Sequence, residues 1–380
     1  MRRIVTLVCA VVFIDTMMFG ALVPLIPHYA DSLELTKSQA GLLLGAYGAG
    51  AFVFGIPSGF LTARIGPRRS VIAGLSLLGT TTVLFAFSDD AIVLGLARLG
   101  QGLASTVSWT GALALITTAT DRARRGELLG TVFGVAMLGY ILGPVVGAIA
   151  ELTSIRLTFC AVSVVATGVA VAISRLEVGS AIPRGAHSIS TALRDPRFVG
   201  GLWLTFVPAV FFGVLEILTP LKLDEAGWGA VAIAAVFVGA GLMETITSPL
   251  VGRLSDRRGR RYPVRLALLG SIVAAALLAA ATRPAVLVPL AIVSAFTFSW
   301  FSTPGMALVA DRAERAGLPQ GLAFGTMNTA WAFGAMAGPA AGAALAHATS
   351  DAAPYLVCAA LCAATFVAML RTRAQPESAR

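Results

Sequence analysis

Twelve long apolar runs, separated by short polar segments, constrain the fold more than any other feature of the sequence. They fall at residues 4–26, 38–60, 70–88, 91–115, 127–149, 155–175, 199–220, 230–251, 264–282, 285–309, 320–346 and 353–371. Each is close to the roughly 20 residues that an α-helix needs to cross a bilayer. Only 12% of the 380 residues are charged, about half the share in soluble globular domains. The sequence therefore predicts an all-α polytopic membrane protein with twelve transmembrane helices, and not a soluble enzyme.

The basic residues indicate which side of the membrane each loop faces. When alternate loops are assigned to opposite sides, most of the 28 lysines and arginines fall on the side that also holds both termini. The exceptions are Lys37, Arg156, Lys222 and Arg283, while Arg98 lies inside a run. By the positive-inside rule the arginine-rich side is cytoplasmic. We therefore expect a multi-pass protein of the plasma membrane with both termini in the cytoplasm.

The second half of the sequence repeats the first. At an offset of 193 residues, Phe19-Gly20-Ala21-Leu22 recurs as Phe212-Gly213-Val214-Leu215. Gly143-Pro144 also has a counterpart, Gly338-Pro339, at an offset of 195. Six helices repeated in the same orientation predict two pseudo-symmetric six-helix bundles with a binding site between them, near the middle of the membrane. We assign the bundles to residues 1–175 and 199–380, and residues 176–198 to a cytoplasmic linker.

Four charged residues lie deep inside the apolar runs: Asp15, Arg98, Glu216 and Glu244. A charge at the centre of a spanning helix costs about 2.5–3.5 kcal/mol on insertion scales. The corresponding positions of the other half are uncharged, so the scaffold itself does not require these charges. We therefore predict that they bind substrate or exchange protons. Alternatively, Asp15 could make a structural hydrogen bond, Arg98 could extend to the outer membrane surface, and the two glutamates could merely border the cavity.

Four uncharged residues complete the predicted site. Gln101 offers Arg98 a polar partner, and the others could line the cavity: Tyr140, Asn328 and Trp331. Three acids against one arginine favour cations or neutral molecules over anions as the substrate.

Several motifs carry a family resemblance. The loop Gly252-Arg253-Leu254-Ser255-Asp256-Arg257-Arg258-Gly259-Arg260-Arg261 resembles the loop motif of the major facilitator superfamily. Arg98-x-x-Gln101-Gly102 resembles the basic motif of its proton-coupled members, and Gly134 followed by Gly143-Pro144-x-x-Gly147 resembles the motif of its drug:proton antiporters. Asp15-Thr16, Phe19-Gly20 and Pro24-x-x-Pro27 resemble the first span of the twelve-helix drug antiporters and vesicular amine transporters. The resemblance implies the major facilitator fold and transport by alternating access.

The resemblance also implies a cytoplasmic gate, in which the acid of the loop motif pairs with the opposite bundle. Only the second copy of the motif has this acid, Asp256, because its counterpart in the first copy is Ala63. The expected gating residues are Gly59, Arg64, Gly66, Gly252, Asp256, Arg257, Gly259 and Arg260, together with Gly143, Pro144 and Gly147. The Gly-Pro motif could bend its helix to seal the cavity against protons, or could be a plain kink.

The leading hypothesis is a proton-coupled transporter that exports small hydrophobic, neutral or cationic molecules, as in drug efflux. The alternatives are a proton-coupled importer or a sugar exporter on the same scaffold and, less favoured, a passive channel or a membrane sensor. No nucleophile–base pair, metal cluster or phosphate loop appears in the sequence. We therefore expect no enzyme activity, cofactor, metal or nucleic-acid partner, and a monomer in the lipid bilayer.

Overall fold

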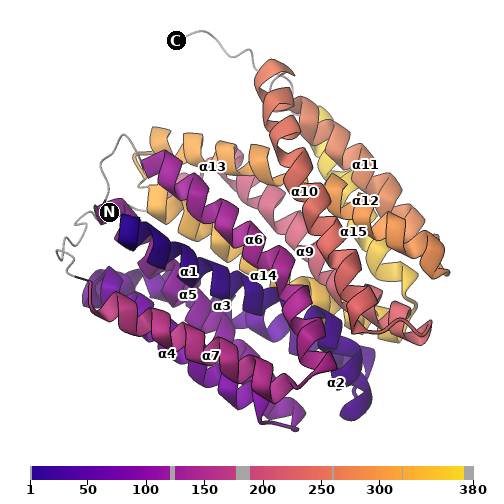
Figure 1. Ribbon diagram of the computed structural model, residues 1–380. Helices are drawn as coiled ribbons and strands as arrows, with labels where there is room; N and C mark the ends of the chain where they lie inside the picture. The colour runs from indigo at the N-terminus through magenta and orange to yellow at the C-terminus, as the bar shows by residue number, and fades with distance from the viewer. Residues whose placement is uncertain (1, 120–124, 177–188, 259–260, 319, 372–380) are drawn as a thin grey trace.

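The computed structural model describes residues 2–119, 125–176, 189–258, 261–318 and 320–371 (Figure 1). The first half contains α1 (Arg2–Gly20), the 3₁₀ turn η1 (Val23–Leu25), α2 (Ile26–Ser32), α3 (Lys37–Ile65), α4 (Pro67–Ala86), α5 (Ala91–Ala119), α6 (Arg125–Leu152) and α7 (Ile155–Ser174). The second half contains α8 (Ile189–Leu193), α9 (Pro196–Glu225), α10 (Ala230–Arg258), α11 (Arg261–Ala280), α12 (Pro284–Ser299), α13 (Ser302–Arg315), α14 (Gln320–Ala348) and α15 (Ala352–Arg371). The described chain has no β-strand, as predicted.

Eleven segments of the described chain are long and apolar enough to cross a membrane. They correspond to eleven of the twelve predicted runs. The remaining run, 320–346, forms α14, whose 29 residues make a helix about 43 Å long at 1.5 Å per residue. The prediction of a polytopic, all-helical membrane protein is therefore confirmed.

Two spans predicted as continuous are interrupted. The first breaks between Gly20 and Val23, and the tenth breaks at Trp300 and Phe301. In each case a proline follows four residues after the break begins: Pro24 after Gly20, and Pro304 after Trp300. Proline has no N–H for the carbonyl four residues earlier, so one helical hydrogen bond is lost at each break. Prolines such as Pro57 and Pro144 lie inside continuous helices of the same chain, so the prolines contribute to the breaks without being sufficient for them.

The predicted linker, residues 176–198, overlaps the start of a helix. Residues 177–188 lie outside the described residues, α8 follows them, and α9 begins at Pro196 rather than near residue 199. Asp195 caps α9 by accepting a hydrogen bond from the backbone of Arg197, and proline suits the first helical turn. The division into two bundles at this segment stays a prediction.

The duplicated Gly-Pro positions make equivalent contacts in the two halves. Gly143 of α6 lies against the backbone of α1, so that an added Cβ would come within 2.6 Å of the Met17 oxygen. Gly338 of α14 lies against the Val210 carbonyl of α9 in the same way. The glycines therefore allow close crossing of the helix pairs α1/α6 and α9/α14.

The halves lie side by side, the first drawn in indigo to magenta and the second in pink to yellow (Figure 1). We call the end at which α1 begins and α15 finishes the terminal end, and the end that holds α2 and the α14–α15 turn the distal end. Near the distal end, α3 crosses α14 closely. A Cβ added to Gly45 or Gly48 would lie only 2.5–2.9 Å from the Met336 backbone. Towards the terminal end, an added Cβ on Gly59 or Gly325 would meet no described atom within 4 Å. Contact between the two helices continues as far as Gly55, where an added Cβ would lie 2.5 Å from Thr329 Oγ1.

The apolar core follows the same division. The largest cluster of buried apolar residues contains members of both halves, for example Leu25 with Phe211 and Leu218. Two smaller clusters are each confined to one half, around Val8 and around Phe198. The halves are thus joined by a shared core in one part of the molecule and have separate cores in the other.

Candidate functional site

Asp15 lies in α1 and is 1% exposed. Its carboxylate accepts hydrogen bonds from the Tyr47 hydroxyl of α3, at 3.3 Å, and from the Ser105 hydroxyl and Trp109 Nε1 of α5, both at 2.7 Å. Three donors from two neighbouring helices offset much of the cost of burying a charge. Asp15 is therefore held in a fixed position within the first half.

Arg98 lies in α5 and is also buried, so its guanidinium does not extend to the surface. Nη1 donates to Gln101 Oε1 at 2.9 Å and to the Met18 carbonyl at 3.3 Å, and Nη2 donates to the Phe19 carbonyl at 3.4 Å. Both carbonyls belong to the last turn of α1, where a helix lacks partners of its own and favours a positive charge. Arg98 therefore caps the interrupted end of the first span.

Arg98 and Asp15 do not form an ion pair with each other. Tyr47 lies between them: its hydroxyl donates to Asp15, and its ring centroid is 4.9 Å from the Arg98 guanidinium carbon. Gln101, the predicted partner of Arg98, also donates to the Thr82 hydroxyl at 3.3 Å. The three groups Asp15, Tyr47 and Arg98 form a chain of polar and cation–π contacts.

Glu216 is the buried acid of the second half. It lies in α9, is 3% exposed, and accepts a hydrogen bond from the Tyr140 hydroxyl of α6 at 2.7 Å. Since α6 belongs to the first half, this bond crosses between the halves. Arg98 lies within electrostatic range of Glu216.

Four aromatic rings lie between the two acids, and we call them the aromatic cluster: Phe19, Tyr47, Tyr140 and Trp331. The Phe19 centroid is 5.0 Å from that of Tyr47, 6.1 Å from that of Tyr140 and 5.2 Å from that of Trp331. The rings come from α1, α3, α6 and α14, and therefore from both halves. Asp15 and Glu216 each accept a hydrogen bond from one tyrosine of this cluster. Aromatic faces flanked by carboxylates attract cations and accommodate apolar groups.

The remaining predicted site residues lie on α10 and α14. Glu244 is half-buried in α10, and its charge is within electrostatic range of Tyr140. Asn328 is half-buried in α14, three residues before Trp331 and so on the same helix face.

The predicted gating residues of the first half lie at the terminal end of α3. Arg64 is exposed in the last turn, and Gly66 connects α3 to α4 with φ of +88°, which glycine adopts readily. In the second half, Arg257 is exposed in the last turn of α10. Gly252 and Asp256 belong to the same helix, but their side chains, like Gly259 and Arg260, lie outside the described residues. The gate stays a prediction.

The Gly-Pro motif of α6 faces α1. Gly143 and Gly147 contact the backbone of Met17 and Ala21, and Pro144 lies against Gly20. These residues therefore pack the first span where it is interrupted.

Sequence reasoning missed two donors to Asp15, Tyr47 and Ser105. Both lie in apolar runs, and no local pattern distinguishes them from packing residues. Only the rotation of α3 and α5 about their axes turns them towards α1.

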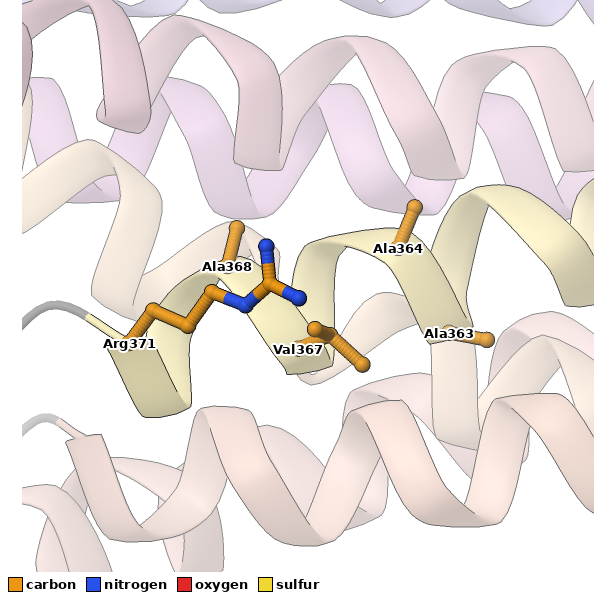
Figure 2. A pocket seen from close by; sticks show the side chains of 5 residues that line it. All are labelled: Ala363, Ala364, Val367, Ala368 and Arg371. Atoms are coloured by element: carbon orange, nitrogen blue, oxygen red, sulfur yellow. The ribbon is translucent and has the colours of Figure 1, made fainter.

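A shallow groove lies near the C-terminal end of α15 (Figure 2). It is lined by Ala363, Ala364, Val367, Ala368 and Arg371. None of the predicted site residues borders it, so it is separate from the candidate site.

Comparisons with known proteins identify the family. A model of the Major Facilitator Superfamily matches residues 8–322 and 227–380. The Chloramphenicol resistance protein of Streptomyces lividans is 31% identical over 91% of this chain and 89% of its own length, and Multidrug resistance protein 2 of Bacillus subtilis (strain 168) is 23% identical over 88% and 86%. Some relatives match only in part. The MFS-type transporter ppzB of Metarhizium rileyi (strain RCEF 4871) is 28% identical over 38% of this chain, and the matched region covers 31% of that protein's length.

Solved structures show the same fold. The nucleoside transporter NupG superposes with a TM-score of 0.75, covering 97% of this chain and 99% of its own, at 14% identity. At that identity the likeness concerns the fold alone. With the family model matching across the chain and a relative at 31% identity over nearly its full length, the sequence-based identification is confirmed: the chain belongs to the major facilitator superfamily.

Proposed function

We propose that the protein is a proton-coupled transporter that exports small hydrophobic, neutral or cationic molecules by alternating access. The observation that carries this proposal is the position of two buried acids, Asp15 and Glu216, on either side of an aromatic cluster built from both halves. The names of several relatives point the same way, since they refer to chloramphenicol and multidrug resistance.

The two acids differ in ways that suggest different roles. Asp15 accepts three hydrogen bonds from its own half, which hold its carboxyl group in a fixed position where it can attract the cationic part of a substrate. Glu216 accepts a hydrogen bond from the opposite half. A bond to a charged acceptor is about twice as strong as one to a neutral acceptor. Protonation of Glu216 would therefore weaken the link to Tyr140 and favour separation of the halves at this depth.

The role of Arg98 would be to position α1 rather than to transfer protons. By binding the last carbonyls of α1, it fixes the segment that carries Asp15 and Phe19. We place both termini, and hence the terminal end, in the cytoplasm; the close crossing of α3 and α14 at Gly41, Gly45 and Gly48 supports a conformation closed at the opposite, distal end.

Inverted membrane vesicles test the proposal. A pH gradient, acidic inside, should drive accumulation of ethidium in vesicles that contain the protein, and nigericin should abolish it. Vesicles preloaded with unlabelled ethidium should also transiently concentrate labelled ethidium without a pH gradient, a counterflow that a passive channel does not support. Accumulation that is insensitive to nigericin, or equal in vesicles without the protein, would contradict the proposal.

A further inference from the structure

Four charged residues meet at the distal end, where the two halves touch. Lys37 Nζ lies 3.1 Å from both carboxylate oxygens of Asp351 and 3.6 Å from Glu225 Oε1. Lys222 Nζ lies 4.0 Å from Asp351 Oδ2. Lys37 is the first residue of α3, in the first half, whereas Lys222, Glu225 and Asp351 belong to the second half. Lys37 therefore connects the halves through two carboxylates.

The position of Lys37 is not explained by its own helix. Thr36 and Gln39 form a complete capping box, which satisfies the first turn of α3 without the lysine. A positive charge in the first turn opposes the helix dipole. A compensating interaction from outside the helix is therefore expected, and the carboxylates of Asp351 and Glu225 provide it.

The internal duplication supplies a control. The offset that relates Gly20 to Gly213 also relates Lys37 to Ala230, which is the first residue of α10. The same place in the scaffold thus starts a long helix without a charge. The lysine is not needed to begin a helix or to mark the membrane boundary there.

The helix crossing beside these charges fixes their geometry. One turn after Lys37, Gly41 contacts Pro339 and Ala343 of α14, only a short distance from the α14–α15 turn that carries Asp351. Lys37 and Asp351 can meet only while α3 and α14 stay crossed at this point. Their side chains are 31% and 21% exposed, so water and salt screen the pair less than a fully exposed one.

We infer that Lys37, Asp351 and Glu225 form a latch between the halves that stabilises the conformation closed at the distal end. The inference rests on the alternating-access part of the proposed function. It adds a set of residues at the end opposite to the predicted Asp256 gate. When the distal end opens, Lys37 leaves both carboxylates.

Asp351 keeps a partner in the open conformation, because Lys222 belongs to the same half. Lys222 also lies over the Tyr355 ring, with its Nζ 5.9 Å from the ring centroid. Asp351 is therefore not left unpaired when Lys37 leaves, and the latch can open and re-form during each transport cycle. Lys222 contacts the same aspartate without crossing between the halves, which makes it the matched control.

Distance measurements between spin labels test the latch. In a variant whose native cysteines are replaced, labels at Ser32 and Thr349 report the separation of the halves, since both residues are exposed at the distal end and neither belongs to the latch. Lys37→Met should raise the ratio of distally open to closed molecules by about two- to fivefold, the range expected for a partly exposed ion pair. Lys222→Met should change this ratio much less. High salt should raise the ratio in the parent protein and not in the Lys37→Met variant.

The outcomes separate the latch from the proposed function. An unchanged ratio in Lys37→Met, or equal shifts in Lys37→Met and Lys222→Met, would overturn the latch. The measurement needs neither substrate nor a pH gradient. A protein that shows the Lys37-specific shift but no ethidium transport would therefore support the latch and contradict the proposed function alone.

Discussion

Tyr140 of α6 donates a hydrogen bond to Glu216 of α9 across the boundary between the two halves, with their oxygens 2.7 Å apart. Both residues lie within apolar runs of the sequence, and the side chain of Glu216 is almost completely buried. Through this bond, the protonation of Glu216 in the second half depends on the position of Tyr140 in the first half. In the proposed mechanism, the charge of Glu216 and the contact between the halves therefore change together.

Removal of the Tyr140 hydroxyl should uncouple these two properties. Tyr140→Phe keeps the ring against Phe19 and deletes the donor. We expect gradient-driven ethidium accumulation to fall by about tenfold or more, since a hydrogen bond to a charged group contributes roughly 1.5–3 kcal/mol, while gradient-independent exchange persists. Tyr29→Phe is the control, because Tyr29 packs on Phe85 within the first half. A similar loss in both variants would mean that the effect is not specific to the bond with Glu216.

Arg98 should tolerate lysine better than alanine. Lysine retains the positive charge at the end of α1 but cannot reproduce the planar fork that reaches both the Met18 and Phe19 carbonyls. We expect partial ethidium transport in Arg98→Lys and almost none in Arg98→Ala. Near-normal transport in both variants would show that capping of α1 is dispensable.

The crossing of α3 and α14 should be sensitive to side-chain volume at one glycine and not at another. An added Cβ on Gly48 would lie 2.5 Å from the Met336 backbone nitrogen, whereas Gly59 has open space. Gly48→Val should therefore lower stability by about 1–3 kcal/mol, the usual cost of overpacking, and Gly59→Val should not. Thermal melting of both variants in the same detergent measures this difference. Equal melting temperatures would contradict the close crossing.

Because only one copy of the loop motif has an acid, substitutions in the two copies should shift the conformational population in opposite directions. Asp256→Asn should shift the population towards the conformation open at the terminal end, and Ala63→Asp should shift it the other way, because a pair formed only in one conformation favours that conformation. An exposed pair contributes about 1 kcal/mol or less. Labelling of a single cysteine at Gly59 in inverted vesicles should rise in the first variant and fall in the second. If neither changes, the motif acts through its arginines on membrane topology.

Helix number and most boundaries were predictable because hydropathy and charge report them directly. The two interrupted spans were not, since the run through Trp300 and Phe301 stays apolar across the break. Pro304 removes the hydrogen bond to the Trp300 carbonyl, but Pro208 and Pro220 lie inside the continuous helix α9. A proline in an apolar run therefore does not by itself predict a break.

The candidate site was predictable in part for a different reason. Buried charges such as Asp15 and Glu216 are conspicuous in apolar runs, so they could be found without a structure. Tyr140 was predicted as a cavity residue, but its bond to Glu216, like the bonds of Tyr47 and Ser105 to Asp15, depends on how each helix is rotated towards its neighbours. That rotation is set by close contacts such as those of Gly48 and Gly143, which no single run encodes.

Proton release on substrate binding tests the central claim most directly. Purified protein in weakly buffered detergent solution is mixed with tetraphenylphosphonium, and the pH change is recorded. If a cation and a proton compete for the acids beside the aromatic cluster, the parent protein releases protons on binding, Glu216→Gln releases far fewer, and a Glu151→Gln control at the distal end behaves like the parent. Binding without proton release, or equal release from the Glu216→Gln variant, would contradict the account.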